Sequence, residues 1–169
     1  VDVGDRVAVE VLIPCGHCRD CIGGRYQVCR ARGGMFGYAY VPLSEPPGLW
    51  GAYADYMYLD PHSIVHPMRK DLPANLAVMF NPLGAGFRWA VEIPETRPGD
   101  TVLVLGPGQR GLASIIAAEA AGADTVIVTG LTRDEAKLRV ARELGADHVI
   151  DVQQEDVRAR VREITGGRG

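Results

Sequence analysis

The sequence lacks the features that mark several specialised classes of protein. None of its apolar runs approaches the roughly 18 residues of a membrane-spanning helix, and no segment reads as a signal peptide. Positive charge is not in excess, because 18 Lys and Arg stand against 21 Asp and Glu and the formal net charge is -3. We therefore expect neither nucleic acid nor a membrane as a partner. What remains is an ordinary globular composition, 47% apolar and 23% charged.

Cysteine is missing from most of the chain, because all four cysteines lie between Cys15 and Cys29. This clustering predicts a metal site in a reducing compartment, here the cytoplasm, more than a disulfide framework. The spacing is C-x2-C-x2-C-x7-C, formed by Cys15, Cys18, Cys21 and Cys29. Four thiolates satisfy a tetrahedral zinc ion and leave no position for water or substrate, so such a zinc is structural.

Two other uses of the cysteines stay open. Three cysteines at x2 spacing also begin ferredoxin cluster motifs, but there the fourth follows after x3 and precedes a proline. Here the gap is x7 and Arg30 follows. Two disulfides would require an oxidising compartment. His17 lies inside the loop and could bind metal, although four cysteines already fill a zinc coordination sphere.

A glycine loop is the clearest signal in the second half of the chain. Thr101–Leu105 has the composition of a strand covered on both faces, and an apolar, alanine-rich helix is expected over Leu112–Ala121. The segment between them fits G-x-G-x-x-G, a pattern that permits a tight turn, backbone approach to a diphosphate and close helix–strand contact. It predicts a dinucleotide site made by Gly106, Gly108, Gln109, Arg110 and Gly111. The alternative is a glycine turn needed only for packing.

The rest of the second half alternates between strand and helix patterns. Strands are expected over 124–129 and 147–151, and helices over 133–144 and 155–164. Such alternation predicts parallel strands joined by right-handed crossovers. Three strands make half of a full dinucleotide-binding sheet.

The residues after the second of these strands bear on the choice of cofactor. A carboxylate usually stands there and binds the adenosine ribose hydroxyls, but here Gly130 is followed by Leu131, Thr132 and Arg133. Without that negative charge, Thr132 and Arg133 could donate hydrogen bonds to a 2′-phosphate. The pattern therefore favours NADP over NAD. The alternative is that Arg133 only opens a helix on a solvated face.

The first half of the chain carries weaker signals. A turn into a strand is expected over 3–9, a loop over 33–51, and a strand with one wet face over 52–59. Large side chains in the loop could line a substrate cleft, although packing is their expected role; they are Met35, Phe36, Tyr38, Tyr40 and Trp50. Helices are expected over 71–80 and 83–91, interrupted at Asn81-Pro82.

The cysteine lobe, the Asn-Pro-Leu-Gly helix start and GPGQRG resemble, in order and spacing, the zinc-containing medium-chain dehydrogenase/reductase family of alcohol and polyol dehydrogenases. The resemblance covers essentially the whole chain. It implies an α/β protein, with part of a GroES-like, β-rich catalytic domain over 1–85 and half of a Rossmann domain over 86–169. It also implies that the four cysteines hold structural zinc and that Gly130 stands where NAD-dependent members carry Asp.

The resemblance further implies that the chain is an incomplete part of a longer protein. The family takes a cysteine and a histidine for its catalytic zinc from the segment that precedes Val1, and its third ligand falls at Asn81. An amide is a poor zinc ligand. Either the parent protein uses another ligand or water, or it has lost that metal. A simpler role for Asn81 is a helix cap, since Asn before Pro at the first helical position is favoured.

The expected activity is hydride transfer between a nicotinamide cofactor, NADP or NAD, and an alcohol, aldehyde or ketone. The resemblance implies a homo-oligomer for the full-length protein, and we expect the chain alone to be inactive. One alternative is a non-catalytic nucleotide-binding or structural relative that has lost the catalytic zinc. Another is a zinc-stabilised interaction module in which the glycine loop is incidental.

Overall fold

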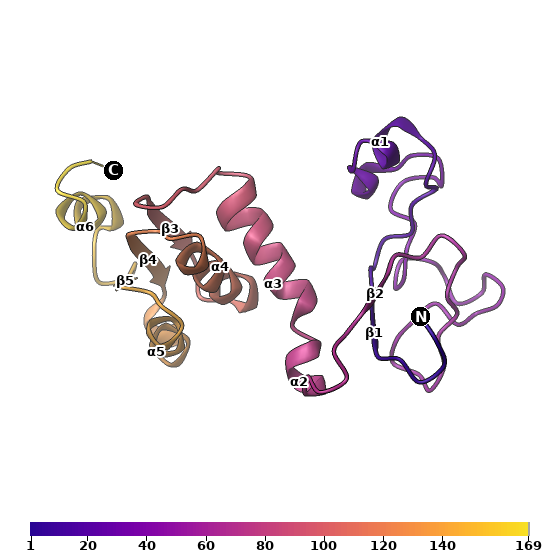
Figure 1. The fold of residues 1–169 in the computed structure, drawn as a ribbon. Coiled ribbons are helices and arrows are strands. Elements are labelled where there is room, and N and C mark those ends of the chain that lie inside the picture. Colours follow the sequence, from indigo (N-terminus) through magenta and orange to yellow (C-terminus); the bar gives the residue numbers. More distant parts are fainter. Residues whose placement is uncertain (169) are drawn as a thin grey trace. The chain divides into compact units, whose positions relative to one another are not determined.

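The computed structural model describes residues 1–168, which divide into two compact units (Figure 1). The first unit is Val1–Ala77, and the second begins at Val78. The domain division expected at 85/86 falls inside a helix, α3 (Phe80–Phe87).

The first unit consists mostly of loops around a small antiparallel pair. Strand β1 (Val7–Val9) pairs with β2 (Val65–Pro67), with Ala8 opposite His66, so the predicted turn into a strand is confirmed. Its helices are a turn or so long: α1 (Arg19–Ile22), the 3-10 helix η1 (Tyr26–Val28) and α2 (Ala74–Ala77). With so little regular structure, this unit must take its stability from side-chain clusters.

Aromatic packing forms the small core of the first unit. Ile13, Tyr38 and Trp50 are buried together. Phe36 meets the Trp50 ring edge-on at a centroid distance of 5.9 Å, and Tyr58 does so at 5.1 Å. The packing role expected for Phe36, Tyr38 and Trp50 is thus confirmed, whereas Met35 and Tyr40 remain exposed and border a cavity of about 360 Å³ beside Trp50.

The strand expected over 52–59 is wrong. Residues 51–60 form no strand, and Tyr53 and Tyr56 are exposed. A strand needs a neighbouring strand that pairs with its backbone N–H and C=O groups. Within residues 1–168, segment 52–59 makes one backbone hydrogen bond, from the Tyr58 amide to the Leu49 carbonyl at 2.9 Å. Tyrosines two or three positions apart indicated a strand with one wet face, but a local pattern does not show whether a partner strand lies beside it.

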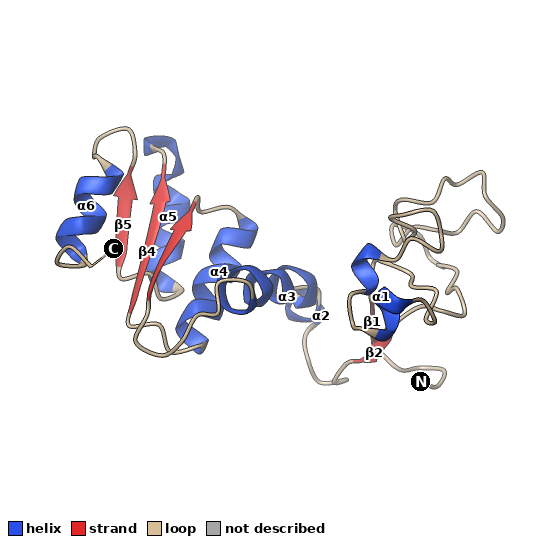
Figure 2. Ribbon diagram, turned by 90° about the horizontal axis from the view of Figure 1, so that it is seen from above, coloured by secondary structure: helices blue, strands red, loops and turns tan. Residues whose placement is uncertain are grey.

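The second unit contains a parallel sheet of three strands in the order β3–β4–β5 (Figure 2). The strands are β3 (Thr101–Leu105), β4 (Thr125–Gly130) and β5 (His148–Asp151). The helices are α4 (Gln109–Ala120), α5 (Glu135–Glu143) and α6 (Val157–Ile164). A short 3-10 helix, η3 (Thr132–Asp134), precedes α5. The predicted alternation and parallel pairing are confirmed. No helix in the described part of the chain combines the length and apolar composition that a bilayer crossing requires.

Helices cover both faces of this sheet. Val104, Val126 and Val128 pack with buried residues of α4 and α5, while Leu103 borders a cavity with Val157 and Val161 of α6. Strand β3 was expected to be covered on both faces, and this is wrong, because Leu103 is 40% and Leu105 77% exposed. As an edge strand, β3 has a neighbour on one side only, and its second face is largely uncovered in the described chain.

Helix α3 starts before Asn81-Pro82 instead of breaking there. Met79 is its N-cap, and a π-helical segment, η2 (Arg88–Glu92), continues it. Pro82 is tolerated because it lies in the first turn, where the missing N–H has no intrahelical acceptor to lose. The expected break at Asn81-Pro82 and the cap role of Asn81 are therefore wrong.

Two glycines of α3 give a matched test of helix packing in the second unit. A Cβ at Gly86 would lie 2.5 Å from the Ala113 carbonyl oxygen of α4, whereas one at Gly84 would meet nothing within 4 Å. We expect Gly86→Ala to lower the free energy of unfolding by about 1–3 kcal/mol, and Gly84→Ala to raise it by about 0.5–1 kcal/mol. Hydrogen exchange of the α4 amides measures the change in the free energy of unfolding for each variant. Equal changes in the two variants would contradict the close approach of α3 and α4.

Candidate functional site

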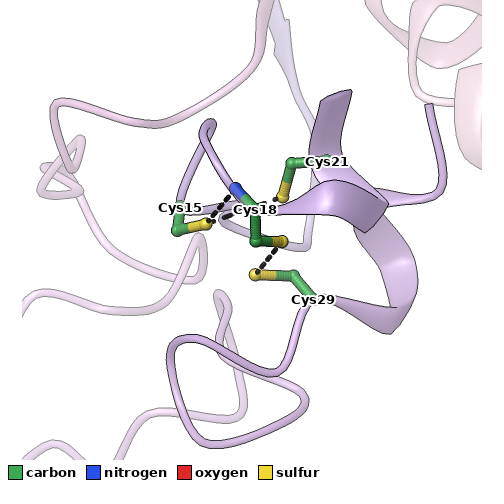
Figure 3. Close-up of side chains that lie close together, drawn as sticks. All are labelled: Cys15, Cys18, Cys21 and Cys29. Atoms are coloured by element: carbon green, nitrogen blue, oxygen red, sulfur yellow. Dashed lines mark hydrogen bonds between the residues drawn. The ribbon is translucent and has the colours of Figure 1, made fainter. Parts of the chain in front are cut away.

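The four cysteines meet at one point of the first unit. Their Sγ atoms all lie within 4.8 Å of one another, and the side chains converge in Figure 3. Cys15 and Cys18 come from the loop before α1, Cys21 from α1, and Cys29 follows η1. The short helices α1 and η1, joined through Gly23 and Gly24, fold the C-x2-C-x2-C-x7-C segment back on itself. This reversal brings Cys29 to the other three cysteines.

The distances between these sulfurs fit one tetrahedral ion and exclude disulfides. Cys15 Sγ lies 3.9 Å from Cys21 Sγ, and Cys18 Sγ lies 3.9 Å from Cys29 Sγ. A disulfide requires about 2.05 Å. Zinc–sulfur bonds of about 2.3 Å in a tetrahedron separate the sulfurs by about 3.8 Å. All four thiols are free, so the donor set and its geometry suit zinc.

Hydrogen bonding and burial act differently on the individual thiols. The backbone amide of His17 is the largest influence on Cys15 and holds the pKa of that thiol down to about 6. Burial is the largest influence on Cys21 and raises the pKa of its thiol to about 11. A divalent cation would favour the thiolate form of every ligand. The exposed His17 ring does not join the cluster, because its Nδ1 lies 2.8 Å from the Cys15 carbonyl oxygen.

A charged cluster braces the loop that follows Cys29. Both guanidinium nitrogens Nη1 and Nη2 of Arg32 donate to Asp60, at 3.0 and 3.3 Å, and Nη2 also lies 2.8 Å from Nδ1 of His62. Partial burial opposes ionisation of Asp60, but hydrogen bonds from Arg32 and from the His62 amide hold its pKa below the ordinary value. No sequence motif pointed to these residues, since 28 positions separate Arg32 from Asp60.

We expect Arg32→Gln to lower the free energy of unfolding of the first unit by about 2 kcal/mol at neutral pH, because Asp60 would stay largely buried without its partner. The matched control is Arg25→Gln. The ion pair between Arg25 and Asp20 is exposed, so this variant should change the free energy of unfolding by less than about 0.5 kcal/mol.

The ion pair between Arg32 and Asp60 should also make stability depend on pH. Since the native pKa of Asp60 is lowered, the contribution of this pair is complete above the unfolded pKa of about 3.9 and is lost as pH falls through the native pKa. Denaturant unfolding at several pH values tests this, and equal losses in both variants would contradict it.

The predicted glycine loop connects β3 to α4. Gly106 has φ +98°, a conformation that side chains disfavour, and its amide donates to the Thr129 carbonyl at 3.2 Å. A Cβ at Gly111 would lie 2.0 Å from the Gly106 carbonyl oxygen. These two glycines therefore serve the turn and the close contact between helix and strand.

Gly108 has no such structural reason. Its φ of -74° and ψ of 174° suit any residue, and a Cβ there would meet nothing within 4 Å. The first helical amide with a partner is that of Leu112, which donates to the Gly108 carbonyl at 2.8 Å, so the amides of Gln109, Arg110 and Gly111 precede the helical ladder. Among residues 1–168 these three amides have no hydrogen-bond acceptor, and the open space beside them at the N-terminus of a 12-residue helix suits a phosphate group.

The side chains of the predicted cofactor residues are not all free for a ligand. The Arg110 guanidinium stacks over the Trp89 ring, 5.1 Å from its centroid. The Thr132 hydroxyl donates to Asp151 at 2.6 Å, and the Thr132 amide donates to Gln153 at 3.1 Å. Arg133 is exposed. No sequence pattern identified Asp151 as a site residue, because only the pairing of β4 with β5 brings it beside Gly130.

Asn81 is exposed in the first turn of α3. Within residues 1–168, the four cysteines are the one group of three or more metal-ligating His, Cys, Asp or Glu side chains. The role of Asn81 beside a catalytic metal stays a prediction.

A parallel sheet with a glycine loop and a lobe of four thiols together indicate a zinc-containing protein of the nucleotide-binding type. Comparisons with known proteins identify the family. Residues 1–70 match the alcohol dehydrogenase GroES-like domain, and residues 111–169 match the zinc-binding dehydrogenase model. A probable alcohol dehydrogenase of Mycobacterium tuberculosis is 51% identical over 168 residues, which are 99% of this chain and 46% of the relative. The sorbitol dehydrogenase of Bacillus subtilis is 33% identical over 167 residues, 99% of this chain and 44% of the relative.

Solved structures agree with this match. An alcohol dehydrogenase from Thermotoga maritima superimposes with a TM-score of 0.86 at 29% identity, over 100% of this chain and 47% of that one. The chain belongs to the zinc-type medium-chain alcohol dehydrogenase family. It spans a little under half the length of the curated relatives given above.

Proposed function

We propose that the protein is a nicotinamide-dependent oxidoreductase that interconverts an alcohol with an aldehyde or ketone. The observation that carries this proposal is Gly108, whose glycine identity neither backbone conformation nor packing requires, beside the first amides of α4. The names of the relatives, alcohol and sorbitol dehydrogenases, support the same reaction class. The substrate is a small molecule bearing a hydroxyl or carbonyl group.

In this proposal the chain binds and orients the cofactor. The amides of Gln109, Arg110 and Gly111 donate to the diphosphate, the positive end of α4 favours its charge, and Gly108 leaves room for it. When bound, the nicotinamide ring supplies the site that accepts or donates hydride. Cys15, Cys18, Cys21 and Cys29 hold a structural zinc that fixes the first unit and takes no part in the reaction.

The remaining assignments follow from the family and are proposals as well. The first unit corresponds to part of the GroES-like catalytic domain, and the second to the start of the Rossmann domain. Four clustered free thiols suit a reducing compartment, so we place the protein in the cytoplasm. Self-association into a homo-oligomer and a catalytic zinc beside Asn81 stay predictions.

The test is turnover by the complete gene product that contains these residues. A panel of primary, secondary and polyhydric alcohols is assayed with NAD and NADP, and formation of the reduced nicotinamide is followed by absorbance. We expect alcohol-dependent reduction by the complete protein and none by residues 1–169 alone, because the parallel sheet of the second unit has three strands, half of a dinucleotide-binding sheet, and the four-cysteine cluster of the first unit is a closed structural site. Cofactor binding without turnover on any alcohol would favour the non-catalytic alternative, and absence of both would overturn the proposal.

A further inference from the structure

The end of β4 has no room for the carboxylate that usually reads the adenosine ribose. A Cβ at Gly130 would lie 2.9 Å from Cδ2 and 3.1 Å from Cγ of Leu138. Leu138 belongs to α5 and is buried in the core of the second unit. A side chain at position 130 would therefore have to displace a packed leucine, which explains the glycine without reference to the cofactor.

Strand β5 brings a carboxylate to the same place. Asp151 is the register partner of Gly130, and paired residues of a parallel sheet point to the same face. The Asp151 carboxylate accepts hydrogen bonds from the Thr132 hydroxyl at 2.6 Å and from the Gln153 amide at 3.0 Å. A cavity of about 370 Å³ is bordered by Thr132, Leu138 and Asp151. The carboxylate is thus fixed at the carboxyl edge of the sheet, where this fold class binds nucleotides.

The negative charge of Asp151 has no ion-pair partner within residues 1–168. Neighbouring carboxylates are compensated, since Asp134 pairs with Lys137 at 2.7 Å and Glu155 with Arg160 at 3.5 Å. The donors to Asp151 are a hydroxyl and a backbone amide, which carry no net charge. The cation that borders the same cavity is Arg142, and neither Arg142 nor the exposed Arg133 forms an ion pair in the described chain.

We infer that Asp151, held by Thr132, recognises the adenosine ribose and makes the protein prefer NAD over NADP. The inference rests on the proposed function. An ionised carboxylate accepts hydrogen bonds from ribose hydroxyls, while the 2′-phosphate of NADP carries up to two negative charges and is repelled by it. Thr132 is engaged with Asp151 and is not a free phosphate donor, so this inference is the opposite of the preference for NADP expected from the sequence.

The experiment titrates the complete gene product with NADH and with NADPH and follows nicotinamide fluorescence. We expect NADH to bind at least about 10-fold more tightly than NADPH. Asp151→Asn should weaken NADH binding and reduce the NADH-to-NADPH affinity ratio by about 10-fold or more. Asp124→Asn is the matched control, because it makes the same change in net charge at the exposed, opposite end of β4 and should leave the ratio unchanged.

A second measurement needs no variant. ADP-ribose and 2′-phospho-ADP-ribose compete with NADH on the unaltered protein, and we expect ADP-ribose to compete at least about 10-fold better. Tighter binding of NADPH, better competition by the phosphorylated analogue, or an unchanged affinity ratio in Asp151→Asn overturns the role of Asp151 and leaves the proposed function standing. Failure of both NADH and NADPH to bind overturns the proposed function and this inference together.

Discussion

Cys29→Ser will release zinc and unfold the first unit while the parallel sheet of the second unit stays intact. Serine is a poor zinc ligand, and structural zinc contributes on the order of 10 kcal/mol to folding. The unit has three large buried core side chains, Ile13, Tyr38 and Trp50, worth roughly 1.5–3 kcal/mol each. Ordering its backbone costs about 1 kcal/mol per residue or more, so the unit depends strongly on the ion.

Metal analysis and hydrogen exchange by mass spectrometry check this result. Peptides from Val1–Ala77 should exchange rapidly in Cys29→Ser, whereas peptides from β3, β4 and α4 should keep their protection, because the second unit has its own core. His17→Ala is the control. Its ring is exposed and directed to the Cys15 carbonyl, so zinc should be retained. Native protection in Cys29→Ser, or zinc loss in His17→Ala, would contradict the four-thiolate assignment.

Gly108→Ala will abolish tight nucleotide binding and leave the fold intact, whereas Gly111→Ala will damage both. The added methyl at position 108 enters open space, so stability should change by less than about 1 kcal/mol. The same space is where the diphosphate approaches the backbone, and affinity for NADH should fall at least about 10-fold. At position 111 the methyl would sit 2.0 Å from the Gly106 carbonyl oxygen, which costs about 1–3 kcal/mol or more.

NADH titration and denaturant unfolding of the two variants separate the two effects. Unchanged affinity in Gly108→Ala would show that the open space beside α4 does not receive the diphosphate. Equal loss of stability in both variants would show that Gly108 is a packing glycine after all.

Local patterns were sufficient to predict the clustering of the cysteines and the strand–turn–helix geometry of the glycine loop, because both motifs are short. The cysteine spacing C-x2-C-x2-C-x7-C limits the thiols to one small loop, and the structure brings their sulfurs together. The strand, the glycine turn and the helix of the cofactor loop are contiguous, so the backbone conformation of Gly106 and the contact of Gly111 follow from 11 neighbouring residues, TVLVLGPGQRG. In each case the chemistry and the chain geometry are encoded in the same segment.

Features that depend on distant partners could not be predicted in this way. The tyrosines of 52–59 indicated a strand, but among residues 1–168 the segment makes a single backbone hydrogen bond, from Tyr58 to Leu49, and pairs with no strand. Asn81 fitted a cap by its neighbour Pro82, yet the N-cap is Met79, two residues earlier, and the helix begins at Phe80. Arg32 meets Asp60 across a long loop, and Asp151 reaches Gly130 only through strand register. These contacts are tertiary, and no local pattern contains them.

Hydrogen exchange of the complete gene product with and without saturating NADH tests the central claim most directly. We predict strong protection, on NADH binding, of the amides of Gln109, Arg110 and Gly111, with no change in the cysteine lobe around Cys15 and Cys29. NADH that binds without protecting the first turn of α4 would place the diphosphate elsewhere and contradict the claim.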